Sequence, residues 1–205
     1  MIGLAAITLT LQLQRSSFDL LDGVDVEVAV HNTAKTPVSM TFPKPAEYEI
    51  DVLRGQDVIW SNITDPPPGV TFPVHAKQFL PGPTIMVVYI WNGVASDGTT
   101  PGPGEYTVRA RLLGTNATQT ASATLHFIDP VPISALEKIK LGDVVTVAGH
   151  LDPTKMTLTD ASGSVALMKR FGTIAPDATV AVRGYLTVLP NHTHAFFVQR
   201  WAVMR

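Results

Sequence analysis

Two histidines near the end of the chain have the spacing of a metal-binding pair. His192 and His194 are separated by one residue, so on a strand their imidazole rings lie on the same side and can share an ion. No acidic residue lies near them in the sequence, and Asn191-His192 is typical of a hairpin turn. The pattern therefore favours a turn, and no metal site is predicted here.

Three aspartates in the first part of the chain form a second set of metal-ligand candidates. Asp19, Asp22 and Asp25 surround Gly23, and carboxylate oxygens are the ligands that calcium prefers. Their spacing differs from that of an EF-hand loop, and Asp-Gly is common in tight turns. The sequence favours a turn at Asp22-Gly23 and predicts no cofactor for the chain.

The last third of the chain carries aromatic and basic residues that could stack bases and contact phosphates. They are Tyr185, Phe196, Trp201, Lys169, Arg170, Arg183 and Arg200. Residues 130–205 hold eight basic and five acidic side chains, and a net charge of +3 is weak for a nucleic-acid partner. Phe196 and Phe197 are adjacent, so at least one of them must face the core. The sequence therefore argues against nucleic acid as a partner.

Enzyme motifs are absent from the sequence. It contains no Gly-x-Ser-x-Gly, no His-Glu-x-x-His and no phosphate-binding glycine loop. It also contains no cysteine, which excludes disulfides and thiol nucleophiles. Six histidines and seventeen carboxylates remain, but their spacing points to no common site. The sequence predicts a protein that is not an enzyme.

The elements that position these residues are predicted to be strands. Residues 7–14 and 24–30 alternate apolar and polar side chains with a period of two. Similar short runs, separated by Gly and Pro turns, give about eight strands up to residue 128 and predict a two-sheet sandwich. Residues 84–91 are nearly all apolar, which predicts a central strand buried on both faces.

A series of framework motifs spans the middle of this region. It consists of Phe42 before a strand with Tyr48, Gly55 before Ile59-Trp60, Phe79 ahead of Pro81-Gly82, then Trp91, and Pro103-Gly104-Glu105-Tyr106-Thr107. This order resembles the BsuPI family of bacterial intracellular proteinase inhibitors over about residues 24–113. The resemblance implies an immunoglobulin-like β-sandwich that inhibits a protease through its loops. We assign Trp60, Trp91, Tyr106 and Phe79 to core packing, because aromatic residues in strands are mostly buried.

The second part of the chain is predicted to be a separate domain. The prolines of Asp129-Pro130-Val131-Pro132 interrupt the strand pattern, so we divide the chain into domains 1–129 and 130–205. Residues 134–140 are a short helix candidate with Ser134 as N-cap. Five strand patterns follow, with Gly149 and Gly184 in the first and fourth, and this arrangement resembles an OB-fold barrel in which glycine permits sharp bending.

Two long loops of the first domain are the predicted functional segments. Residues 61–77 include a stiff proline run, and residues 92–103 are polar and rich in glycine. The site residues expected to contact a protein are Pro66, Pro67, Pro68, Val70, Phe72, Asn92 and Asp97. A surface connection without function remains the alternative for both loops.

The predicted function is non-catalytic protein binding, which by resemblance inhibits a protease. The alternative is a structural or accessory subunit that docks on a larger complex, such as one on the extracytoplasmic face of a membrane. Charged residues make up only 16% of the chain, which favours a surface covered by a partner. The sequence shows no transmembrane run and no signal peptide, so we expect a cytoplasmic protein, or a periplasmic or cell-envelope one if a leader was removed.

Overall fold

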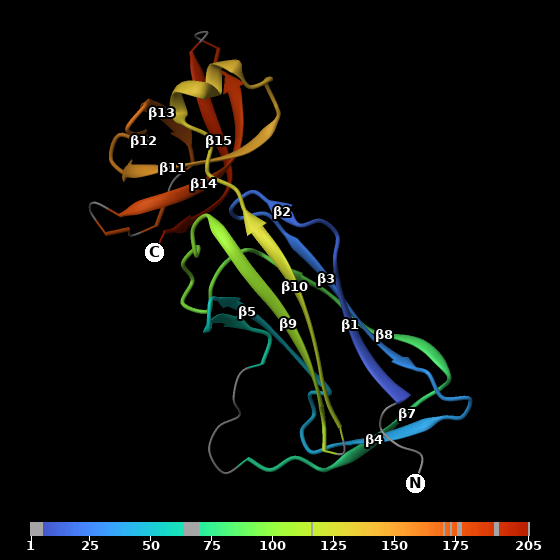
Figure 1. The fold of residues 1–205 in the computed structure, drawn as a ribbon. Helices are drawn as coiled ribbons and strands as arrows, with labels where there is room; N and C mark the ends of the chain where they lie inside the picture. Colours follow the sequence, from blue (N-terminus) through green and yellow to red (C-terminus); the bar gives the residue numbers. More distant parts are fainter. Residues whose placement is uncertain are drawn as a thin grey trace. The chain divides into compact units, whose positions relative to one another are not determined.

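The computed structural model describes residues 6–63, 70–115, 117–169, 171–172, 174–175, 178–190 and 193–204. Strands are the main secondary structure of these residues (Figure 1), and a short 3-10 helix, η2, lies at Ile133–Lys138. The all-β fold predicted from the alternating patterns is therefore confirmed. By packing, the chain falls into two compact units, which we call the sandwich unit and the barrel unit.

The sandwich unit comprises residues 1–16, 24–91 and 105–125. Its first sheet has the order β1 (Ile7–Leu13), β3 (Val24–Asn32), β8 (Gly82–Trp91), and all neighbours are antiparallel. A second sheet contains β10 (Ala117–Phe127), β9 (Gly104–Gly114), β5 (Tyr48–Arg54) and β6 (Asp57–Ser61), in that order. A separate pair joins β4 (Val38–Phe42) to β7 (His75–Phe79).

The core of the sandwich unit is built by the period-two alternation of its strands. In β3 every second side chain, from Val24 to Val30, is at most 1% exposed. In β9 the same alternation buries Tyr106, Val108 and Ala110. A valine or other apolar side chain at each inward position removes apolar area from water and fixes the register of the strand.

Strand β8 differs from its prediction. It is the last strand of its sheet, and Ile85, Val88 and Ile90 are 62%, 61% and 65% exposed. The register with β3 shifts between Val28 and Ala29, so Met86 has no partner residue and forms a bulge. Because the bulge breaks the period of two, apolar residues of the exposed face and of the inner face follow one another in the sequence as one apolar run. The prediction of a central strand buried on both faces was therefore wrong.

The barrel unit comprises residues 17–23, 92–104 and 126–205. Its five long strands close into a barrel in the order β11 (Val144–Asp152), β12 (Thr157–Asp160), β13 (Gly163–Met168), β15 (His194–Val203), β14 (Thr179–Val188). The unit also contains the short β2 (Ser17–Phe18), which pairs in parallel with His126 and Phe127 of β10. The division into domains at residue 129 stays a prediction.

Two glycines allow the barrel strands to approach closely. A Cβ atom at Gly149 would lie 2.3 Å from the carbonyl oxygen of Thr159, and one at Gly184 would lie 1.9 Å from that of Phe197. Both distances are far shorter than van der Waals contact, so no other residue fits without a shift of the backbone. The glycines predicted to permit bending thus lie where neighbouring strands leave no room for a side chain.

The short helix begins differently from its prediction. It follows Pro132 directly, and no side chain caps it from the N-cap position. The amide of Ile133 instead donates to Oδ2 of Asp160 at 2.8 Å, and the amide of Ser134 donates to Oγ of Ser162 at 2.9 Å. Asp160 and Ser162 lie at the turn between β12 and β13, so the prediction of a Ser134 cap was wrong because a distant turn supplies the acceptors.

Candidate functional site

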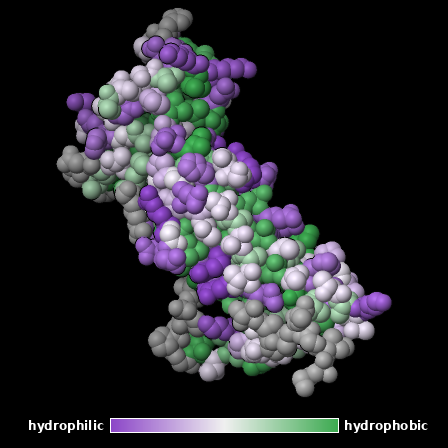
Figure 2. All heavy atoms as spheres, viewed as in Figure 1, coloured by the Kyte–Doolittle hydropathy of each residue, from purple (hydrophilic) through white to green (hydrophobic). Residues whose placement is uncertain are grey.

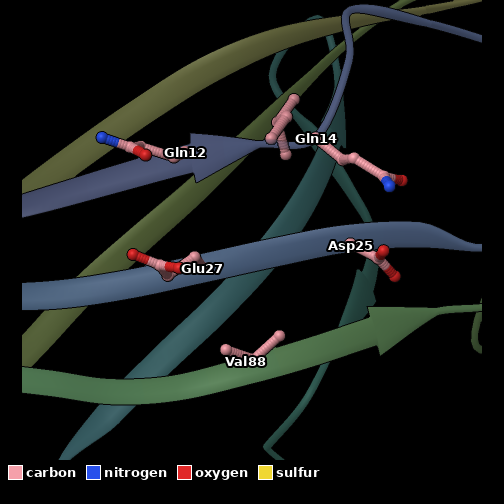
Figure 3. Close-up of a pocket in the computed structure, with 6 residues that line it drawn as sticks. Gln12, Gln14, Asp25, Glu27 and Val88 are labelled. Atoms are coloured by element: carbon pink, nitrogen blue, oxygen red, sulfur yellow. The ribbon is translucent and has the colours of Figure 1, made fainter.

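The outer face of the β1–β3–β8 sheet is divided into a polar and an apolar side. The register aligns Gln12 of β1 with Glu27 of β3 and Val88 of β8, and Figure 3 shows these three side chains on adjacent strands. The next row along the sheet contains Asp25 opposite Ile90. Amides on β1, carboxylates on β3 and apolar side chains on β8 therefore lie side by side across one face.

A shallow cleft of about 230 Å³ lies on this face. It is lined by Gln12, Leu13, Gln14, Asp25, Glu27 and Val88. The amide nitrogen of Gln14 donates to the carbonyl oxygen of Asp25 at 3.4 Å, which continues the strand pairing beyond the end of β1. The side chains of Gln12, Gln14, Asp25 and Glu27 offer oxygen acceptors, and Val88 and Leu13 offer apolar contact.

The carboxylates of this face differ from other carboxylates of the sandwich unit. Asp51 pairs with Arg109 at 2.7 Å, Glu47 with Lys77 at 2.5 Å, and Glu49 with Arg111. Asp25 and Glu27 are half-buried and form no ion pair within the described residues. Their negative charge is therefore not neutralised by a side chain of the described chain.

The apolar row consists of Ile85, Val88 and Ile90 on β8. All three are more than 60% exposed, and Leu80 just before the strand is 64% exposed. In Figure 2, hydrophobic residues reach the molecular surface between hydrophilic ones. Single exposed apolar residues are common, but a row on one strand marks a surface that another molecule can cover.

The free edge of β8 adds a second feature. Within the described part of the chain no strand pairs with β8 on the side away from β3. Pro83, which lacks an amide hydrogen, and the bulge at Met86 interrupt the first half of the strand. Residues 87–91 continue without an interruption in the register, so this half of the edge can accept a further strand.

Aromatic side chains lie under the same edge, on the inner side of β8. The ring of Trp60 on β6 is 5.3 Å from that of Tyr89 and 6.1 Å from that of Trp91. Trp91 is 1% exposed, whereas Trp60 and Tyr89 are only half-buried. The predicted core role is confirmed for Trp91, Tyr106 and Phe79, each 1% exposed, and Trp60 combines packing with partial exposure.

The first predicted loop is partly described. Pro66, Pro67 and Pro68 lie outside the described residues. Val70 is 46% exposed and Phe72 is 37% exposed. The loop is shorter than expected, because residues 75–77 belong to β7.

The polar side chains of the second predicted loop form hydrogen bonds within the loop. Oδ1 of Asn92 accepts a hydrogen bond from the amide of Val94 at 3.2 Å. Oδ1 of Asp97 accepts from both the amide and the hydroxyl of Thr99, at 3.0 and 2.6 Å. Asn92 and Asp97 are exposed but fix turns of their own loop. This loop belongs to the barrel unit, whereas Val70 and Phe72 belong to the sandwich unit.

The set of three aspartates is not a shared site in the structure. Asp19 and Asp22 both pair with Arg183, at 2.8 and 2.9 Å, within the barrel unit. Asp25 lies on β3 of the sandwich unit. Two of the three carboxylates thus form ion pairs with Arg183. The sequence did not indicate these pairs, because Arg183 is more than 160 residues away.

The remaining candidates are dispersed. His194 is exposed, His192 lies outside the described residues, and in the described chain no three metal-ligating side chains gather. Phe196 is fully buried while Phe197 is 39% exposed, as their adjacency predicted. Lys169, Arg200 and Trp201 line one cleft of the barrel unit, and Arg170 lies outside the residues described.

The sequence reasoning missed the face that the structure brings together. The spacing of Asp25 indicates only a calcium ligand or a turn, and the apolar run at residues 84–91 predicts only a core strand. Pro83 carried a usable signal, because proline within a strand pattern is confined to sheet edges, to the first residue of a strand or to bulges. That the described chain supplies no cation to Asp25 and Glu27 could not be read from the sequence, since ion pairs such as Asp51–Arg109 and Asp19–Arg183 join residues that are far apart along the chain.

Comparisons with known proteins give distant structural likenesses. No family model and no curated protein matches the chain. The β-glucosidase EmGH1 from Erythrobacter marinus is similar at 14% identity and a TM-score of 0.35, covering 60% of this chain. The sporulation control protein Spo0M from Bacillus subtilis is similar at 12% identity and a TM-score of 0.38, covering 95% of this chain and 91% of its own. This chain spans 15% of the glucosidase chain.

Likenesses of this size assign no function. The resemblance to the BsuPI inhibitors stays a prediction, because no family model matches the chain. Among the described residues, no helix has the length and apolar character needed to cross a membrane.

Proposed function

We propose that this protein is a non-catalytic protein-binding module that docks a partner at strand β8 of its sandwich unit. The observation that carries the proposal is the row of Ile85, Val88 and Ile90, each more than 60% exposed on a strand whose outer edge no other described strand pairs with. A partner that covers this row removes apolar area from water, which is the main source of binding free energy. This role corresponds to an accessory subunit of a larger assembly.

A cross-linking experiment tests this proposal. A photo-activated cross-linking amino acid is placed at Ile90, and in a control protein at Lys155, which is 79% exposed in the barrel unit. After irradiation in the native cell, we expect one discrete adduct from position 90 and none of the same mass from position 155. The additional substitution Val88→Asp should abolish this adduct. Equal adducts from both positions, or none from position 90, would refute the proposal.

A second function, inhibition of a protease, is supported by a different segment. Val70, Phe72 and Val74 precede β7 and are 46%, 37% and 64% exposed. Alternating exposed apolar side chains on a non-helical segment suit insertion into a protease cleft. Purified protein at micromolar concentration should then slow at least one member of a panel of serine proteases. A protein with Val70→Ser and Phe72→Ser should lose that effect, and the absence of inhibition across the panel would refute this function.

A further inference from the structure

We infer that the partner segment at β8 is an extended strand in which basic residues alternate with apolar ones, added beside residues 87–91. This inference rests on the proposed function and specifies the chemistry of its partner. It depends on three features of the sandwich unit: the open half of the β8 edge, the charges on the outer face and the aromatic rings on the inner face.

The edge restricts where a strand can be added. Pro83 offers no amide hydrogen, and the bulge at Met86 disturbs the spacing of the backbone groups. From Val87 to Trp91 the register with β3 is unbroken, and no described strand lies beyond it. An added strand therefore forms its regular hydrogen bonds along these five residues, with side chains alternating between the two faces of the sheet.

The outer face selects basic residues. An added strand lies about 5 Å from β8 and about 10 Å from β3. The alkyl stem of a lysine or arginine at this position covers Val88 or Ile90, and its charged head reaches toward Glu27 or Asp25. These two carboxylates have no cationic partner in the described chain, so one long basic side chain satisfies both the apolar row and the charge. An acidic side chain at the same position would be repelled.

The inner face selects apolar residues. Side chains on this side of an added strand point toward Tyr89 and Trp60, whose rings are 5.3 Å apart and half-buried. Contact with these rings removes apolar area from water without requiring a charge. The two faces together specify an alternation of basic and apolar residues, which is the ordinary two-residue period of a strand.

A second copy of the chain fits this edge less well. Residues 82–91 contain no lysine or arginine. If β8 of one molecule paired with β8 of another, the apolar rows would meet, but the added strand would bring no cation to Asp25 and Glu27. Charge complementarity therefore favours a separate basic segment over self-association.

Synthetic peptides test the inference directly. A fluorescent nine-residue peptide that alternates lysine and valine is compared with one that alternates glutamate and valine, and with a peptide of the same lysine and valine content arranged in blocks. Fluorescence anisotropy with the full chain measures each Kd. We expect the alternating lysine peptide to bind about tenfold more tightly than the glutamate peptide, because two exposed charge pairs contribute up to about fivefold each. It should also bind more tightly than the block peptide, whose lysines cannot all lie on one face of an added strand. Two further peptides carry N-methyl groups on the odd-numbered or on the even-numbered backbone amides. Only one of these two sets of amides faces β8 in an added strand, so only one of the two peptides should lose its binding.

Matched variants identify the site. The double variant Asp25→Asn, Glu27→Gln should bind the alternating lysine peptide about tenfold less tightly. Its affinity for the glutamate peptide should not fall. The control, Glu137→Gln with Asp143→Asn, removes the same charge from exposed positions of the barrel unit and should leave the preference unchanged. An equal loss in both variants would overturn the inference, because the effect would then come from net charge.

The remaining outcomes separate this inference from the proposed function. A cross-linked partner at position 90 together with equal binding of all peptides would overturn the basic–apolar pattern and leave protein docking at β8 intact. Absence of that cross-link refutes the docking function itself. A dimer in sedimentation equilibrium that Ile90→Lys abolishes would assign the edge to a second copy and overturn the inference.

Discussion

The surroundings of Arg183 in the barrel unit and of β8 in the sandwich unit differ in whether the described chain supplies partners for its charged side chains. In the barrel unit, Arg183 is 17% exposed and pairs with both Asp19 and Asp22. The hydroxyl of Thr146 in the same unit is buried and donates to the carbonyl oxygen of Leu20 at 2.8 Å. These buried and partly buried charged and polar groups thus find partners within the unit, as stability requires of buried polar groups.

In the β8 region, exposed apolar side chains and two acidic side chains have no partner among the described residues. Ile85, Val88 and Ile90 are exposed, and Asp25 and Glu27 form no ion pair within the described residues. Neither feature stabilises the chain by itself. Under the proposed function, the barrel cluster (Arg183, Asp19, Asp22 and Thr146) supports folding, whereas the exposed residues of β8 contact another molecule. Substitutions in the first region should therefore change stability, and substitutions in the second should change binding.

The largest effect on stability is expected at Gly184. In Gly184→Ala the new Cβ would lie 1.9 Å from the carbonyl oxygen of Phe197, so β14 and β15 must separate. We expect a loss of about 3 kcal/mol in the free energy of unfolding, or failure to fold. Urea unfolding measures the change. Gly172→Ala is the matched control, because no atom lies within 4 Å of its added Cβ; equal losses in both variants would show that close strand approach is not the cause.

A smaller loss is expected from removing Arg183. Arg183→Leu leaves Asp19 and Asp22, which are 28% and 13% exposed, without their cation. Because unpaired carboxylates in a partly buried site are costly, we expect about 2 kcal/mol of destabilisation. The control is Lys155→Leu, which removes a 79% exposed partner of Asp152 at 3.5 Å and should cost less than about 0.5 kcal/mol. A cost for Arg183→Leu as small as that of the control would remove the distinction between the two regions.

Sequence patterns predicted the local structure of both units well. The alternation of residues 24–30 predicted β3 with its buried face. Gly149 and Gly184, predicted to permit bending, were recognised as special positions, and the structure places them at close contacts between barrel strands. These features depend on neighbours along the chain or on the volume of a single residue. For this reason they could be recognised without knowing the fold.

Features that depend on distant residues were not predicted. The bulge at Met86 is visible only in the pairing of β8 with β3, and it concealed that every exposed side chain of the row lies on one face. The cap of the short helix comes from Asp160, 27 residues from Ile133. Arg183 reaches Asp19 across an even longer separation. Tertiary pairing decides such contacts, and one sequence without its fold does not specify them.

Asp160 connects stability of the barrel unit to pH. Burial alone would raise the pKa of its carboxyl, but hydrogen bonds from the side chain of Ser162 and from the amides of Ile133, Ser162 and Gly163 outweigh burial and lower the pKa below 3.8. The lowered pKa stabilises the folded state above the unfolded value near 3.8, and this contribution is lost as pH falls through the folded value.

Asp160→Asn should therefore reduce the acid dependence of unfolding. At pH 7 we expect a loss of about 1 kcal/mol, because the neutral amide accepts these hydrogen bonds more weakly than the carboxylate does. Between pH 5 and pH 2 the variant should lose less stability than the original protein, and the two curves should converge. Urea unfolding at each pH measures both. Parallel curves would show that the carboxylate is not part of the acid response.

The smallest effect on stability is expected at Ile90, where the comparison is most sharply tested. Because this side chain is 65% exposed, Ile90→Ser should change the free energy of unfolding by less than about 0.5 kcal/mol. The same substitution should reduce the affinity for the alternating lysine peptide, since the stem of the basic side chain loses its apolar contact, and Ile90→Val should retain most of it. A loss above about 1.5 kcal/mol in urea unfolding would mean that Ile90 supports the fold. The exposed row would then belong with the barrel cluster as a stabilising feature, and the division between folding residues and contact residues would fail at β8.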